Sequence, residues 1–241
     1  MSCLALAQLD QDDFAAALPL FEQALAVCRR RVGDLDPNTL TCKYNLAECH
    51  AQMGNPRLAL PLAEECLRGH QQTMGGEHQD TLLAMSTLRA VHSELGHYDE
   101  ALPLGRCALE GQRRTLGNEH AETQISISRV GFILQRMGDK EGALPLYEED
   151  LRLSRRTLGS EHPETLIAIA NLGSLYCSLG RHGEGLPLLR EAVAGRRKVH
   201  GEDPTETQET FQELEYWEAQ AAEEVEEETM SDRMRKRRRF R

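Results

Sequence analysis

Several features that mark particular protein classes are scarce in this chain of 241 residues. Aromatic residues make up only 5% of it, with a single tryptophan, which is little for a compact globule built on a large core. No apolar run approaches the roughly 20 residues that a membrane span needs. The short apolar stretch Leu4–Leu9 follows no basic region, so we expect no signal peptide. The sequence therefore predicts a cytoplasmic protein with no membrane partner.

Catalytic and metal-binding motifs are also missing. Seven cysteines are an odd number without a CxxC pair, which is typical of small buried hydrophobes in a reducing compartment. No Gly-x-Ser-x-Gly elbow and no Gly-x-x-x-x-Gly-Lys phosphate loop occurs. No four His or Cys residues have the spacing of a closed zinc site. We expect no enzyme activity, small-molecule substrate, cofactor or metal.

Charge is unevenly distributed along the chain. The net charge is −11, yet residues 221–241 hold 7 basic and 6 acidic side chains, so the excess of acid lies in the body. An acidic body does not favour nucleic acid, which binds clustered basic faces. We expect the acidic-then-basic segment 223–241 to be disordered. Three alternatives remain open for its basic cluster Arg235–Arg239, namely nuclear import, contact with an acidic surface, and folding back onto the body.

A period of 42 residues is the main signal in the sequence. Ala-Leu-Pro-Leu recurs at 17–20, 59–62, 101–104 and 143–146, and Gly-Leu-Pro-Leu follows at 185–188. Threonine recurs in the same register at Thr39, Thr81, Thr123, Thr165 and Thr207. A match of this length without insertion or deletion predicts a structural repeat.

Each repeat is expected to hold two helices. The first, such as 39–53, would open at a capping threonine, Thr39, and stop at Gly54. The second, such as 56–74, carries Pro61 near its start, where the amides have no intrahelical acceptor. Three histidines lie on the period in the loops between repeats, and we expect cap and loop hydrogen bonds of them, not metal binding. They are His78, His120 and His162.

These repeats predict an all-α fold, a right-handed superhelical solenoid of antiparallel helix pairs stacked through small residues. The solenoid would span 1–222, with a partial first unit 1–33, full units 34–75, 76–117, 118–159 and 160–201, and a closing helix from about 206.

A few residues depart from the repeat pattern. Arg89 and Glu215 stand where the other first helices carry a small residue, and Ala63 and Gly105 stand where other second helices carry a large one. We therefore expect looser packing in units 34–75 and 76–117. The periodic leucines Leu102 and Leu144 are expected to be buried. The first unit begins inside its first helix, so we also expect a fragment or a frayed end.

The small–large pattern resembles the tetratricopeptide repeat. Its 42-residue spacing, Ala-Leu-Pro-Leu and the Gly-x-Glu-His-Pro-Glu-Thr of residues 159–165 resemble the kinesin light chain type. This resemblance implies an adaptor that binds a partner or cargo segment in a concave groove. No sustained heptad run precedes the first repeat, so the sequence gives no support to motor attachment.

The resemblance also indicates which residues line the groove. Asn45 and Asn171 resemble the family's peptide-clamping asparagine, because a carboxamide can donate to and accept from a peptide unit. Arg129, with Arg136 two turns on, would favour an acidic side chain. The candidate groove residues are Tyr44, Asn45, Glu48, Thr87, Ser128, Arg129, Phe132, Arg136, Asn171, Ser174 and Tyr216.

Two alternatives remain open. In the first, Asn45 and Asn171 cap neighbouring backbone groups and hold no peptide. In the second, the chain is a structural scaffold or a self-associating repeat module.

Overall fold

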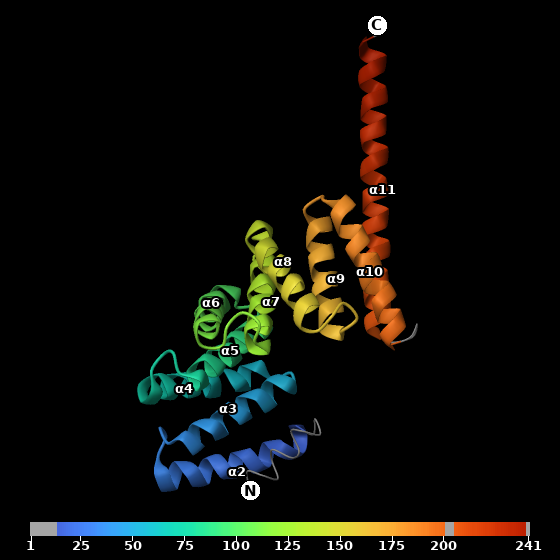
Figure 1. The fold of residues 1–241 in the computed structure, drawn as a ribbon. Coiled ribbons are helices and arrows are strands. Elements are labelled where there is room, and N and C mark those ends of the chain that lie inside the picture. The colour runs from blue at the N-terminus through green and yellow to red at the C-terminus, as the bar shows by residue number, and fades with distance from the viewer. Residues whose placement is uncertain (1–13, 201–204, 240–241) are drawn as a thin grey trace. The chain divides into compact units, whose positions relative to one another are not determined.

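The structure, a computed structural model, describes residues 14–200 and 205–239, and over these residues it consists of α-helices without a strand (Figure 1). The helices divide into two compact units, Met1–Met137 and Gly138–Arg241. The predicted all-α solenoid of helical hairpins is confirmed. The sequence led us to expect one continuous array, whereas the division falls inside the expected unit 118–159.

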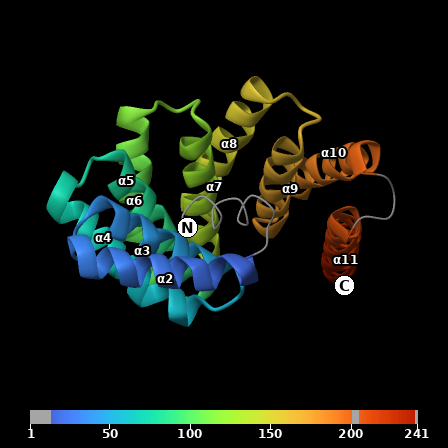
Figure 2. The ribbon, with the colours of Figure 1, turned by 90° about the horizontal axis from the view of Figure 1, so that it is seen from below.

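The N-terminal unit is a stack of successive helices, each packed against the next (Figure 2). The first helix of one hairpin, α3, also contacts the first helix of the following hairpin, α5. First helices therefore line one face of this unit, as they do in a solenoid of hairpins. The helices are α2 (Phe14–Val32), α3 (Pro37–Gln52), α4 (Pro56–Met74), α5 (Gln79–Glu94), α6 (Tyr98–Thr115) and α7 (Ala121–Arg136).

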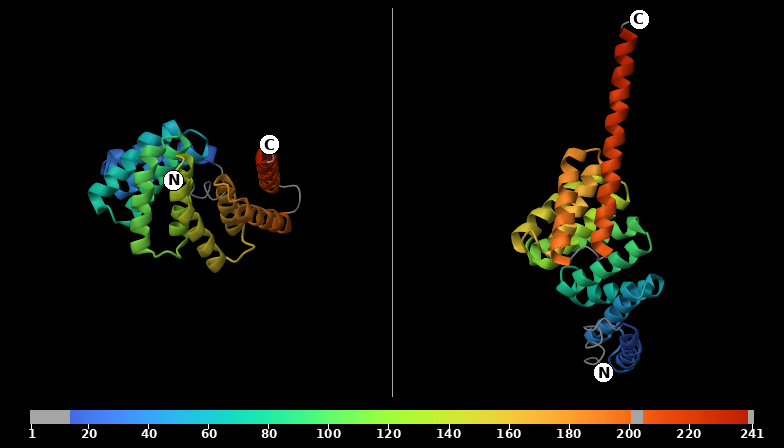
Figure 3. Two further views of the ribbon diagram at one scale, coloured as in Figure 1. Left: turned by 90° about the horizontal axis from the view of Figure 1, so that it is seen from above. Right: turned by 90° about the vertical axis from the view of Figure 1, so that its right-hand side faces the viewer.

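The C-terminal unit holds α8 (Lys140–Thr157), α9 (Pro163–Ser178), α10 (His182–His200) and α11 (Thr205–Arg239). The hairpin of α9 and α10 is closed by α11, which contacts both helices. Figure 3 shows α11 running on well past its two partners.

The continuation of α11 to Arg239 differs from the expectation that 223–241 lacks regular structure. The sequence offers a physical reason. Glutamate, methionine, lysine and arginine, all good helix formers, dominate this segment. The acidic residues also precede the basic ones, which is the order that the helix dipole favours.

The prediction that the periodic threonines cap the first helices was wrong. Thr39 lies inside α3, and its hydroxyl donates to the Gly33 carbonyl oxygen at 2.7 Å. The capping acceptor of α3 is Asp36 Oδ1, 2.9 Å from the Asn38 amide nitrogen. In the later hairpins the Nδ1 atoms of His78, His120 and His162 accept the corresponding amide bond at 3.2, 3.3 and 3.2 Å. The periodic histidines are therefore cap residues, as expected, and the threonines are not.

Small residues bring the paired helices together. Ala59, Ala101 and Ala143 are fully buried near the starts of their helices. In the C-terminal unit, a Cβ atom at Gly185 would lie 2.6 Å from the Gly173 carbonyl oxygen of α9. The stacking expected from small residues is thus present in both units.

The prediction that the periodic leucines are buried was wrong. Leu102 and Leu144 are half-buried, whereas the alanine before each has no exposed surface. The narrow buried stripe of these helices faces the neighbouring helix through the alanine. The leucine one position further lies about 100° around the helix, at the edge of that stripe.

Packing at one departure from the repeat pattern, the pair Arg89 and Gly105, is close, contrary to our expectation for the unit 76–117. Arg89 is only 8% exposed to solvent. A Cβ atom at Gly105 would lie 3.0 Å from Arg89 Cδ. The long side chain thus fills the space that glycine leaves. The opposite arrangement holds in the hairpin of α9 and α10, where Gly173 packs against the fully buried Leu189.

Candidate functional site

Three side chains share one register on the first helices of the N-terminal unit. Asn45 on α3, Thr87 on α5 and Arg129 on α7 are one repeat period apart. Asn45 and Thr87 are largely buried, at 8% and 7% exposure, whereas Arg129 is exposed. We refer to this face as the first-helix groove of the N-terminal unit.

Asn45 lines a pocket of about 310 Å³ at one end of this face. Neighbouring lining residues include Cys28, Asn38 and Cys42, from α2 and α3. Despite its burial, the Asn45 side chain makes no hydrogen bond with the residues that the structure describes, and the same holds for the half-buried Asn171. Backbone capping by these asparagines is therefore not seen.

Tyr44 forms the apolar side of the groove. It packs against the core cluster that contains Ala47, Ala63 and Met85. Burial raises the pKa of its hydroxyl to about 12, with the charge of Glu48 acting in the same direction and the hydrogen bond with Thr87 in the opposite one. The hydroxyl therefore stays protonated near neutral pH. Tyr44 and Thr87 are therefore one pair of predicted groove residues that lie close together in this unit.

Arg136 is held by aromatic rings at the far end of α7. Its Nε donates to the Tyr98 hydroxyl at 3.1 Å, and its guanidinium carbon lies 5.6 Å from the Tyr98 ring centre and 6.0 Å from that of Phe132. Phe132 remains 41% exposed. Ser128, on the same helix, is half-buried. Arg136 is thus in contact with two aromatic rings, and its role in binding an acidic side chain stays a prediction.

In the C-terminal unit, α9 and α11 carry the predicted residues. The hydroxyl of Ser174 lies 2.9 Å from the Ala170 carbonyl oxygen and 2.5 Å from Glu213 Oε1. Glu213 therefore ties α11 to α9 close to Asn171. Tyr216 is 56% exposed and meets the Trp217 ring edge-on, with ring centres 4.9 Å apart.

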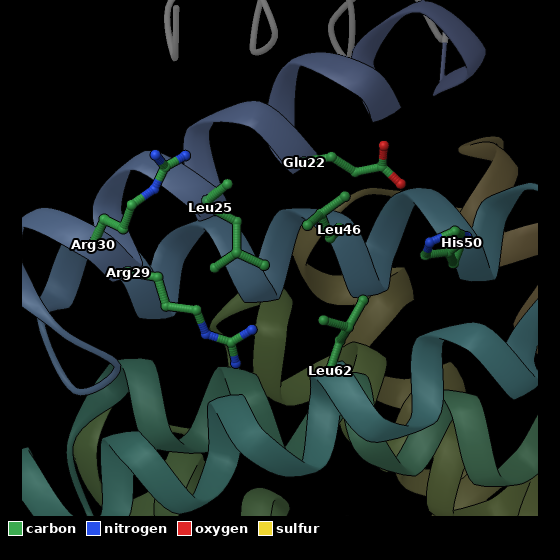
Figure 4. Close-up of a pocket in the computed structure, with 8 residues that line it drawn as sticks. Glu22, Leu25, Arg29, Arg30, Leu46, His50 and Leu62 are labelled. Atoms are coloured by element: carbon green, nitrogen blue, oxygen red, sulfur yellow. The ribbon is translucent and has the colours of Figure 1, made fainter.

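Two further pockets, which sequence reasoning missed, lie between neighbouring helices. One of about 630 Å³ is lined by α2, α3 and α4. Figure 4 shows Leu25, Leu46 and Leu62 in its middle, Arg29 and Arg30 at one end, and Glu22 and His50 at the other. A second, of about 510 Å³, uses the equivalent residues three periods later, among them Leu151, Arg155 and Leu172.

Ion pairs hold the arginines beside these pockets. Arg29 lies 3.0 Å from Glu65, and Arg155 lies 2.8 Å from Glu191, the equivalent pair three periods on. These exposed contacts contribute about 0–1 kcal/mol each. The repetition of both pocket and ion pair follows from the 42-residue period, which was the available signal. The two arginine-rimmed pockets are therefore a consequence of the repeat itself.

No group of three or more His, Cys, Asp or Glu side chains could hold a metal ion within the described part of the chain. Across the same residues, no helix has the length and apolar character needed to cross a membrane.

Helical hairpins that stack through small residues, with their first helices along one face, define a helical-repeat protein. The sequence model of the tetratricopeptide repeat matches residues 1–72, 43–114 and 122–198. The chain belongs to the tetratricopeptide repeat family, and its repeats are of the kinesin light chain type. Its fold is that of a protein-interaction repeat module.

Several solved structures are similar. A putative kinesin light chain of Podosopora anserina with nearly identical repeats is 25% identical, with a TM-score of 0.70, and the match covers 82% of this chain and 93% of that one. BtubC from P. vanneervenii is 22% identical, with a TM-score of 0.68 and 90% coverage of both chains. A Rap protein in complex with Competence and Sporulation Factor is 14% identical, with a TM-score of 0.63, 92% coverage of this chain and 66% of that one. No curated protein matches this chain.

Proposed function

We propose that the chain is an adaptor whose first-helix groove in the N-terminal unit binds an extended peptide segment of a partner protein. The observation that carries this proposal is Asn45. Asn45 is largely buried and lines a pocket, and its carboxamide is not used in a hydrogen bond with the described residues. The donor and the acceptor of the carboxamide therefore remain available to a ligand in that pocket. A peptide unit, with one donor and one acceptor, matches both groups whatever side chain the unit carries.

The neighbouring side chains fit the same occupant. Tyr44 offers apolar surface on one side, and Arg129 offers an exposed cation one period beyond Thr87. The bound segment would thus combine backbone recognition at Asn45 with an acidic side chain towards Arg129. Among similar folds, the Rap protein is seen in complex with Competence and Sporulation Factor, which is in keeping with a binding role for such solenoids.

The test begins with selecting ligands from a random peptide library on the purified chain. Affinities of the selected peptides are then measured by fluorescence anisotropy for the native chain and for Asn45→Ala. We expect Asn45→Ala to weaken binding by about 1–3 kcal/mol, because it removes both polar groups of the carboxamide. Helicity should not change.

Asn118→Ala is the matched control, since it makes the same chemical change at an exposed loop position of the same unit. It should leave the affinity as it is. If Asn45→Ala and Asn118→Ala bind the selected peptides equally well, the site lies elsewhere, and the recurring arginine-rimmed pockets become the next place to search.

A further inference from the structure

Two cysteines share one cavity in the N-terminal hairpin. Cys28 of α2 and Cys42 of α3 both line the pocket of about 310 Å³, and Cys28 packs against the core cluster that includes Cys42 and Leu46. Cys42 is only 6% exposed, whereas Cys28 is half-buried. Both thiols are free. The pocket thus holds a buried thiol together with one that small molecules in the solvent can reach.

The two cysteines lie at the same level of this hairpin. α2 ends at Val32, and α3, which packs against it, begins at Pro37. Cys28 precedes the end of α2 by four residues, and Cys42 follows the start of α3 by five. Each is therefore about 6–8 Å from the turn along its own helix. A disulfide requires facing positions of this kind, because it joins Cα atoms about 4.4–6.8 Å apart.

The repeat gives a second indication that these two positions face each other. Four periods later they are occupied by Arg196 of α10 and Thr210 of α11, and Arg196 Nη1 donates to Thr210 Oγ1 at 2.7 Å. Side chains in this register thus meet across a helix pair. The other units lack cysteine at both positions, where they carry His70 and Ala84, Gln112 and Ser126, and Ser154 and Ala168. The pair of thiols is therefore a feature of the first hairpin and not of the repeat.

The two thiols differ in their environments. Burial raises the pKa of the Cys42 thiol to about 11, and the charge of Cys28 and a hydrogen bond with the Cys28 side chain act in the same direction. Cys42 therefore stays protonated near neutral pH, which makes it a poor first nucleophile. Cys28 is the more accessible of the two, so an oxidant meets Cys28 first.

We propose that Cys28 and Cys42 form a peroxide-sensitive dithiol, whose oxidation to a disulfide ties α2 to α3. The Cys28 thiolate attacks one oxygen of hydrogen peroxide, the O–O bond breaks, and a sulfenic acid and hydroxide form. The Cys42 sulfur then attacks the Cys28 sulfur, the S–O bond breaks, and the released hydroxide leaves with the Cys42 proton as water. Two thiols are oxidised and one peroxide is reduced to two waters. In a reducing compartment other thiols open the bond again, so the cross-link is transient.

Cys49 provides an internal comparison. It belongs to the same core cluster and follows Cys42 by seven residues, which is about 10 Å along α3. In the folded chain Cys28 should therefore link to Cys42 and not to Cys49. If the cysteines served only as small apolar residues of the core, peroxide would leave the folded chain without a link between them.

The experiment treats the full, reduced chain with hydrogen peroxide, blocks the remaining thiols with N-ethylmaleimide, and identifies linked peptides by mass spectrometry. Digestion with trypsin and a glutamate-specific protease separates Cys28 from Cys3 and Cys42 from Cys49. We expect a Cys28–Cys42 peptide as the main linked product, its loss on treatment with dithiothreitol, and its absence from Cys28→Ser and Cys42→Ser. The Cys42→Ser chain should instead keep a sulfenic acid at Cys28, which dimedone traps.

Cys107→Ser is the matched control, because it removes an exposed cysteine of α6 and should form the cross-link as the native chain does. The proposal fails if the folded native chain yields no Cys28–Cys42 peptide, if Cys49 competes equally with Cys42, or if the link forms only in urea. Mapping of the native chain decides the question even where a serine variant does not fold. No peptide ligand is used, so the outcome is independent of the test of Asn45.

Discussion

A single acceptor atom determines where each first helix begins. In α3 this atom belongs to Asp36, and in α5, α7 and α9 it is the Nδ1 atom of a histidine. We placed the cap three residues later, at the periodic threonines, because threonine is itself a good cap. Proline at the first helical position, as at Pro37 and Pro163, was the signal for the true start.

Replacing His162 by alanine should destabilise the C-terminal unit by about 0.5–2 kcal/mol, because the Glu164 amide loses its acceptor. His162→Asp should keep most of the stability, as aspartate is the cap that α3 uses. Urea unfolding followed by circular dichroism measures both variants. His97 stands before α6 without making a cap bond, so His97→Ala should cost little. Equal losses in His97→Ala and His162→Ala would contradict the capping role.

At the scale of whole helices, the sequence was a good guide to where they lie. The period predicted helices over 39–53 and 56–74, and the structure has them at Pro37–Gln52 and Pro56–Met74. Which side chains face the neighbour was harder to predict. Adjacent apolar residues such as Ala143 and Leu144 look equivalent in a pattern, yet the alanine alone is fully buried. The distance between paired helices determines which of the two residues is buried. That distance cannot be predicted from the sequence of one helix alone.

The close approach of α9 and α10 makes a sharp prediction for two glycines of α10. Gly185→Ala should destabilise the fold by about 1–3 kcal/mol, because its Cβ would lie 2.4 Å from Cys177 Sγ and 2.6 Å from the Gly173 carbonyl oxygen. Gly183→Ala should be neutral or stabilising by about 0.5–1 kcal/mol, since open space surrounds that position and alanine favours a helix. The midpoints of thermal unfolding of the two variants are compared with that of the native chain. If Gly185→Ala costs no more stability than Gly183→Ala, the predicted close approach of α9 and α10 at Gly185 is contradicted.

For the molecule as a whole, the fold class followed from the repeat, but two features did not. The division at residue 137 was not predicted, because the repeat pattern continues across it without interruption. The helical continuation of α11 was not predicted either, because we weighed its lack of apolar residues above its helix propensity. At the candidate site, the register of Asn45 and Arg129 was visible in the sequence.

Ending the chain after Gln220 should leave the midpoint of thermal unfolding nearly unchanged. Residues 222–224 of α11 are exposed, so removing this part of the helix uncovers little apolar surface. The helical signal in circular dichroism should fall, since the structure has α11 continuing to Arg239. A large drop in the midpoint would show that the end of α11 packs on the rest of the protein.

Arg89 is large where Gly105 is small, and this complementarity affects how the repeat can change in evolution. A single substitution at either position leaves a void or a collision, so the two positions should change together among descendants of this sequence. A relative with glycine at the position of Arg89 should therefore carry a bulky residue at that of Gly105, as Gly173 and Leu189 do here. The same coupling constrains anyone who builds a longer array by copying units of this protein, because the hairpin from 76 to 117 must be copied with both halves intact.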